Sequence, residues 1–196
     1  MPNQTKGGFR YKRSLSGATG PTITLEPVAS NNTLAIFTGD VVTRSSGGYC
    51  LAAGASTADI LGVMDGVEQY WDGENLRKGR YLPAATVYST VLTRKSIIRV
   101  ISAIDAVFEV DCDDTTISTE ANFIAMIGEN CDTTVTAGST TTGQSNHCLD
   151  LSTKAATALQ FRVLGISSIP EGPDFAVARV KVDVKVHESH LFGAGV

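Results

Sequence analysis

The chain has 196 residues, a length that fits one domain of generous size. Hydrophobic residues make up 42% of the chain and charged residues 18%, so a buried core can form and extended disorder is excluded. The formal net charge of −4 argues against wholesale binding of nucleic acid. No apolar run approaches the roughly 20 residues of a membrane-spanning helix, and no apolar stretch follows the N-terminal cations. We therefore expect neither a membrane segment nor a secretory signal.

Residues 1–20 are predicted to form a flexible basic N-terminal arm. This segment contains cations without an acid, several glycines, and too few apolar residues to fold alone. A short basic arm on an acidic body typically reaches for an acidic partner or for phosphate. We expect the arm to be mobile in the isolated protein and to become ordered on a neighbour. The predicted partner-binding residues are Lys6, Phe9, Arg10, Tyr11, Lys12 and Arg13.

Residues 21–196 are predicted to form a single, mainly β domain, an antiparallel β-barrel or sandwich. Turn signals recur about every 8 to 12 residues between short apolar runs, which is typical of these folds. Gly62 and Gly66 interrupt one such run and indicate bulges or barrel corners. The expected strands are 22–29, 33–44 with a bend at Gly39-Asp40, 49–54, 59–71, 81–93, 96–104 and 106–110, with a polar loop at 72–80.

Residues 111–160 are the least regular part of the pattern and are treated as a candidate insertion. A short helix is expected there, with Ser118 or Thr119 as N-cap, Phe123, Ile124 and Ile127 at helical spacing, and Gly128 as its end. The Thr/Ser/Gly-rich stretch 132–156 predicts an exposed loop or a set of short edge strands.

The strictest pattern in the chain lies near its C-terminal end. Valines at 180, 182, 184 and 186 alternate with charged residues and a histidine. This period of two predicts a long strand over 177–187 with the valines on a core face and the charges in solvent.

The Gly-rich stretch 39–63 favours turns over a phosphate-binding loop. It contains neither of the common phosphate-binding glycine motifs, and no helical pattern follows the glycines.

The four cysteines, Cys50, Cys112, Cys131 and Cys148, include no C-x-x-C pair. We interpret them as structural, buried free thiols.

The sequence predicts no catalytic, cofactor-binding or metal site. The stretch "GQSNH" at 143–147 differs from a nucleophile elbow because His147 stands where the second glycine belongs. His147 and Cys148 are adjacent, so in a strand they would point to opposite faces. The acidic stretch 109–114 lacks the spacing of a calcium loop and is interpreted as a solvated strand end. We therefore expect a protein that is not an enzyme and needs no cofactor.

One part of the sequence resembles the head decoration proteins of tailed bacteriophages, also called cement or auxiliary capsid proteins. The resemblance covers roughly residues 35–90 and is carried by four short motifs: Gly39-Asp40-Val41-Val42, Ala52-Ala53-Gly54-Ala55, Ile60-Leu61-Gly62-Val63, and Gly79 to Ala84. It implies a β-barrel that binds the outside of the major capsid protein shell and strengthens it. It also implies a homo-oligomer, with a trimer favoured, located on the capsid exterior of a virion assembled in the host cytoplasm. Direct binding of nucleic acid or membrane is not expected.

Two other classes of function stay open at this point. The first is a different virion component, such as a tail or head–tail joining protein. The second is a β-sandwich module that binds carbohydrate, for which an exposed aromatic platform around Tyr70 and Trp71 would be the distinguishing feature.

Overall fold

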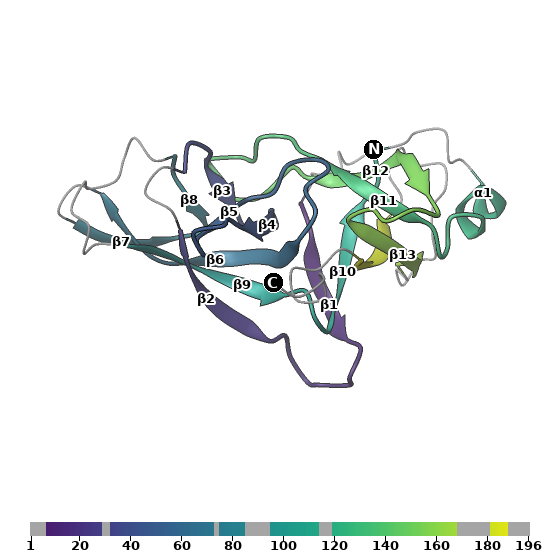
Figure 1. Ribbon diagram of the computed structural model, residues 1–196, viewed down its shortest axis with the longest axis horizontal. Helices are drawn as coiled ribbons and strands as arrows, with labels where there is room; N and C mark the ends of the chain where they lie inside the picture. The colour runs from purple at the N-terminus through teal and green to yellow at the C-terminus, as the bar shows by residue number, and fades with distance from the viewer. Residues whose placement is uncertain are drawn as a thin grey trace.

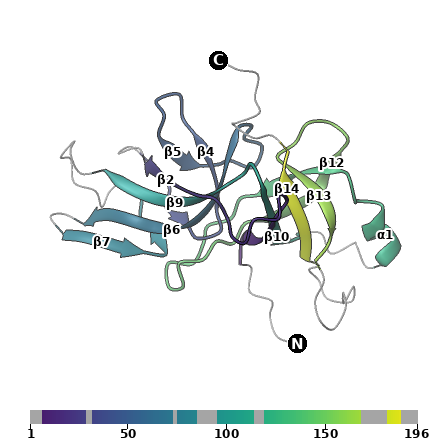
Figure 2. The ribbon, with the colours of Figure 1, turned by 90° about the horizontal axis from the view of Figure 1, so that it is seen from below.

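The computed structural model describes residues 7–28, 32–72, 75–84, 95–113, 119–167 and 181–187. The described chain is mainly β with one short helix, as the sequence predicts. Its strands gather into two units that lie side by side (Figures 1 and 2). No helix within these residues is long and apolar enough to cross a membrane.

The first unit is a closed five-stranded β-barrel. Its strands follow the order β4-β5-β2-β9-β6, and an additional pairing between β4 and β6 closes the ring. The free part of β6 pairs with β7, and a separate two-stranded ladder joins β3 to β8. The bounds are β2 (Ile23–Val28), β3 (Ile36–Phe37), β4 (Val41–Arg44), β5 (Cys50–Ala52), β6 (Ile60–Asp72), β7 (Asn75–Gly79), β8 (Tyr81–Leu82) and β9 (Ser96–Ser102).

The glycines within β6 have the role that the sequence predicts for them. A Cβ at Gly62 would lie 2.0 Å from the carbonyl oxygen of Ile101, so only glycine lets β6 approach β9 this closely. The register between these two strands shifts between Met64 and Gly66. Such irregularities bend a strand and allow a small sheet to curl into a barrel.

The second unit is a six-stranded sheet with the order β1-β10-β14-β13-β11-β12. An isolated bridge between Cys112 and Leu149 brings β12 back to the end of β10, so this sheet also curls toward closure. β1 pairs antiparallel with residues 106–109, the first part of β10. The bounds are β1 (Arg10–Ser14), β10 (Ala106–Asp111), β11 (Asn130–Thr134), β12 (Cys148–Ala155), β13 (Phe161–Ile166) and β14 (Lys181–Val186).

Two hydrophobic cores explain why β4 and β6 are apolar on both faces. Val42, Leu61 and Met64 point into the first barrel, whereas their neighbours Val41, Ile60 and Val63 join the core of the second unit. Opposite faces of one strand therefore belong to two cores. The core of the second unit includes side chains of both units and so fixes the two units against each other.

The segment 111–160 is part of the second unit and is not an insertion. It contributes β11 and β12 and the core residues Phe123, Met126, Leu149 and Leu151. The stretch 132–156 thus includes β12, which stands at the end of the sheet order as the edge-strand alternative expects, but its buried side chains rule out a fully exposed loop. The reason is that β12 turns Leu149 and Leu151 into the core on one face, and Cys148, which points to the other face, is also buried.

The short helix forms where the sequence predicts it. α1 spans Glu120–Ile124, and its N-cap is Thr119, whose side chain accepts a hydrogen bond from the backbone N–H of Asn122. The predicted buried face is only partly right. Phe123 is buried, but Ile124 and Ile127 are 56% and 47% exposed, because Met126 packs into the core in their place.

The final strand confirms the alternation of valines. Val182, Val184 and Val186 are buried in β14, while residues 177–180 of the predicted strand, Val180 among them, lie outside the described residues.

The loop expected at 72–80 is in part a strand. Its residues 75–79 form β7, a strand in which every side chain is exposed, so no apolar alternation marks it in the sequence.

Residues 7–14 belong to the folded body and not to a separate arm. β1 pairs with β10 through Arg10↔Glu109 and Arg13↔Val107. Phe9 is only 2% exposed, and its ring stacks on that of Phe161 with 4.6 Å between centroids. Sheet hydrogen bonds and burial of this ring offset the entropy lost on ordering the segment. Residues 1–6 lie outside the described residues.

Candidate partner-binding surface

The outer face of the second unit is a charged surface formed by β1, β10, β13 and β14. Residues paired across neighbouring strands lie on the same face of a sheet. Because Val182 and Val184 point into the core, Lys181, Asp183 and Lys185 point outward. The strand register then places the remaining members of this face. The charged residues on it are Arg10, Lys12, Arg13, Arg162, Lys181 and Lys185, with Glu109 and Asp183 as the carboxylates, whereas Asp111 shares this register but is buried.

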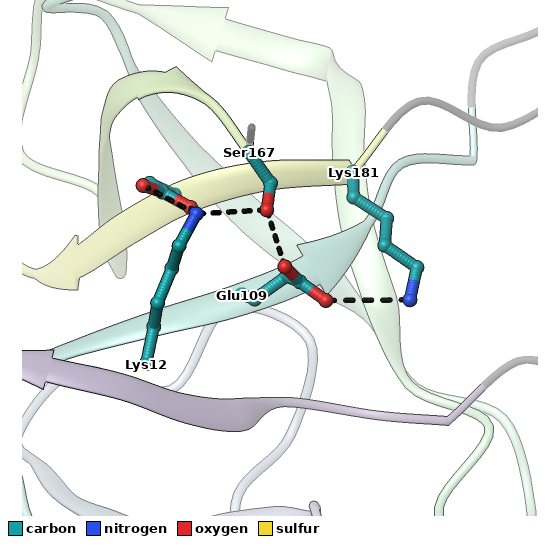
Figure 3. A network of polar contacts seen from close by, with 5 residues as sticks. Lys12, Glu109, Ser167 and Lys181 are labelled. Atoms are coloured by element: carbon teal, nitrogen blue, oxygen red, sulfur yellow. Dashed lines mark hydrogen bonds and ion pairs between the residues drawn. The ribbon is translucent and has the colours of Figure 1, made fainter. Parts of the chain in front are cut away.

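One part of this surface is a network of compensated charges (Figure 3). The Lys12 ammonium contacts both carboxylate oxygens of Asp183, at 2.8 and 3.1 Å, and donates to the Ser167 hydroxyl at 2.9 Å. Ser167 in turn donates to Glu109, whose other oxygen lies 3.3 Å from the ammonium of Lys181. The side chains of Lys12 and Asp183 are only 27% and 13% exposed. This network ties β1 to β10, β14 and the end of β13.

The charge of Glu109 is maintained by its neighbours. Partial burial alone would raise the pKa of this carboxyl, but the hydrogen bond from Ser167 and the nearby Lys181 and Lys12 outweigh burial and hold the pKa below its usual value. The carboxylate therefore stays ionised near neutral pH. Its role in the network is structural.

The other part of the surface is a row of uncompensated cations, which we call the cationic row: Arg13, Lys185 and Arg162. Val107 pairs with Arg13 on one side and with Lys185 on the other, and Lys185 pairs with Arg162. Neighbouring strands are about 5 Å apart. Within the described residues, these three cations form no ion pair.

The placement of Lys185 opposite Arg162 is unfavourable for the isolated protein. Like charges directly opposite each other on neighbouring strands are destabilising. Both Arg13 and Arg162 are exposed, so an approaching anionic surface can reach them. A local arrangement that lowers stability is typical of a site that acts on a partner.

The structure divides the six predicted partner-binding residues into distinct groups. Phe9 and Lys12 have partners inside the fold and are not free to contact a neighbour. Tyr11 is half-buried against the core, whereas Arg10 and Arg13 are exposed on β1. Lys6 lies outside the described residues. Sequence reasoning missed Lys185 and Arg162, whose proximity to Arg13 depends on the strand order.

A buried polar cluster lies elsewhere, between the two units, and contains a Ser, a His and an Asp. The Nε2 of His147 is 3.4 Å from Oδ1 of Asp40, the backbone N–H of Phe37 donates to Oδ2 of Asp40, and the nearby Ser145 side chain acts to lower the pKa of this carboxyl. Burial raises the pKa of Asp40 against the influence of His147, and burial lowers the pKa of His147 against that of Asp40. In a hydrolytic triad the imidazole lies between the serine and the carboxylate. Here the carboxylate is in the middle and Ser145 is fully buried, so a substrate cannot reach it.

The surroundings of the four cysteines indicate a structural role. All four are buried, and none forms a disulfide. Burial raises the pKa of Cys50 and of Cys131 to about 12, and it raises the pKa of Cys112 well above its ordinary value. Thiols of this kind are poor nucleophiles and poor ligands. The described residues contain no group of His, Cys, Asp and Glu that could hold a metal ion.

The aromatic pair Tyr70-Trp71 does not form a platform. Both residues lie on β6, where adjacent side chains point to opposite faces. Tyr70 packs against the core of the first barrel, and Trp71 pairs across the hairpin with Leu76. The feature that would favour a carbohydrate-binding module is therefore missing at these two residues.

Comparison of the chain with family models, curated proteins and solved structures found no match.

Proposed function

We propose that this protein is a non-enzymatic structural component of a virion that binds the outside of the major capsid shell and stabilises the phage head. The observation that carries the proposal is the cationic row, three cations that form no ion pair within the described residues and of which Arg13 and Arg162 are exposed, on a chain whose net charge is −4. An acidic protein surface is the partner that such a row fits. The resemblance of residues 35–90 to decoration proteins supports the same function.

The fold supplies what such a role needs. A closed barrel leaves few free strand edges, and the core of the second unit packs side chains of both units together. A packed body that bridges neighbouring capsid subunits would resist their separation. We propose that several copies, in trimers, act in this way on the capsid exterior.

Location on the particle is the first test. Gold-labelled antibodies raised against the purified protein would be applied to particles of the phage whose genome encodes it. Uniform labelling of the head is the expected result. A ring of label at the neck or label along the tail would favour another virion component, and unlabelled particles would overturn the proposal.

The binding surface is tested by two matched double variants. Arg13→Gln/Arg162→Gln removes two cations from the cationic row, and Arg80→Gln/Lys154→Gln removes two exposed cations elsewhere. An exposed ion pair contributes about 0.2–1 kcal/mol, and the first variant removes two cations that could each form one with the partner. We therefore expect this variant to bind heads that lack the protein about tenfold more weakly at low salt. The control variant should bind like the wild type. Equal loss in both variants would show that only net charge matters, and the cationic row would then have no specific role.

A further inference from the structure

A second surface lies at the opposite end of the molecule, on the hairpin formed by β6 and β7. This hairpin projects from the first barrel (Figures 1 and 2). Among the described residues β7 pairs only with β6, and it stands at the end of its sheet. All five of its residues are exposed, so the body of the protein covers neither of its faces.

The free edge of β7 is regular. The irregularity in the hairpin register lies on β6, between Val67 and Tyr70, and the partners on β7 follow one another without an extra residue. A regular edge strand presents a row of unpaired N–H and C=O groups that can pair with a further strand. β1, the corresponding edge of the second unit, contains a register shift between Tyr11 and Arg13 and is less suited to such pairing.

The charges on β7 select the kind of strand that fits. Arg77 and Lys78 are adjacent and therefore point to opposite faces, and their side chains are 54% and 70% exposed. Their ion pairs with Asp72 and Glu68 lie at exposed positions, where such pairs contribute little. Leu76, beside them, is 54% exposed. A second copy pairing antiparallel about Arg77 would bring two guanidinium groups together, which is unfavourable.

We propose that β7 is a docking edge for an extended acidic segment of a partner protein. The segment would add a strand to the sheet through main-chain hydrogen bonds. Two adjacent carboxylates would lie opposite Arg77 and Lys78, one on each face, and an apolar side chain would lie against Leu76. This site does not depend on the cationic row, and the inference does not rest on the proposed capsid function.

The test uses the full-length protein and a synthetic peptide of about ten residues, made of alternating Thr and Val around a central Glu-Glu pair. Amide hydrogen exchange would be followed by NMR with and without the peptide. We expect slower exchange of β7 amides, with the protection confined to this strand. A peptide with Lys-Lys at its centre should have no effect. A third peptide, which keeps the Glu-Glu pair but has prolines on both sides, should bind at least tenfold more weakly because it cannot form the ladder.

Two double variants separate this site from the cationic row. Arg77→Gln/Lys78→Gln should weaken binding of the acidic peptide about five- to tenfold, whereas Arg13→Gln/Arg162→Gln should leave it unchanged. The inference is overturned if the proline peptide binds as well as the first peptide, if the second variant and not the first loses binding, or if 1 mM acidic peptide leaves β7 exchange unaltered.

Discussion

Phe9 and Phe161 stack with their ring centroids 4.6 Å apart and an interplanar angle of 25°, although 152 positions separate them in the chain. Phe9 comes directly before β1, and Phe161 begins β13. The contact inserts the N-terminal segment into the core of the second unit. Together with the pairing of β1 with β10, it makes residues 7–14 part of the fold.

Phe9→Ala is therefore expected to destabilise the protein by about 3–5 kcal/mol, the usual cost of removing a buried phenylalanine. Chemical denaturation would measure the change in the free energy of unfolding. Leu15→Ala, at a side chain that is 50% exposed, is the control and should change stability by less than about 0.5 kcal/mol. Equal stability of the two variants would place Phe9 outside the core.

Lys185→Gln is expected to have the opposite effect and to raise the free energy of unfolding by about 0.2–0.5 kcal/mol. The substitution removes a charge that lies opposite Arg162 on the neighbouring strand. The gain should diminish at high salt because salt then screens the repulsion between the half-buried Lys185 and the exposed Arg162. Thermal unfolding at two salt concentrations checks this. A loss of stability at low salt would show that the cationic row is compensated within the protein.

Val184→Asp is expected to cost several kcal/mol, because it places an unpaired carboxylate at a position that is fully buried in the core. The matched control is Val135→Asp, at a valine that is 42% exposed, and it should change stability by less than about 0.5 kcal/mol. The midpoints of thermal unfolding of both variants would be compared. Similar midpoints would contradict the assignment of the inner face of β14.

Gly62→Ala should destabilise the first barrel strongly, since the new methyl group would lie 2.0 Å from the Ile101 carbonyl oxygen and must push β6 away from β9. The position for comparison is Gly165, where an added Cβ meets nothing within 4 Å. Gly165→Ala should be neutral or stabilising by up to about 1 kcal/mol, because alanine restricts the unfolded chain. If the two variants unfold at the same denaturant concentration, the close approach at Gly62 is not essential.

The raised pKa of Cys50, about 12 against an ordinary value of 9.0, makes stability depend on alkaline pH. A group whose pKa is higher in the folded state contributes stability that is complete below pH 9 and is lost as the pH rises toward 12. The stability difference between wild type and Cys50→Ala should therefore shrink by about 1–2 kcal/mol between pH 8 and pH 10.5. Denaturation at both pH values measures it. A constant difference would show that the Cys50 thiol is accessible to solvent in the folded state.

Patterns confined to a few neighbouring residues were sufficient to predict several parts of this fold. The alternating valines of β14, the Thr119 cap of α1 and the glycines of β6 all act through local geometry. The turn spacing likewise predicted a β-barrel or sandwich, although the parallel pairing of β2 with β5 in the barrel was not foreseen. The sequence alone therefore determined the fold class and the inner face of its clearest strand.

The tertiary structure decided what depends on partners far apart in the chain. Glu26 is a charged residue and is nevertheless buried. β4 supplies its partner, because it brings the Arg44 guanidinium to within 2.5 Å of the Glu26 carboxylate. β7 forms without any apolar alternation, because it pairs with the end of β6 that extends beyond the barrel. The cationic row joins β1, β14 and β13, and only the strand order makes Arg13, Lys185 and Arg162 neighbours. Period and composition report which face of a strand is buried, but they contain no information on which strands lie side by side.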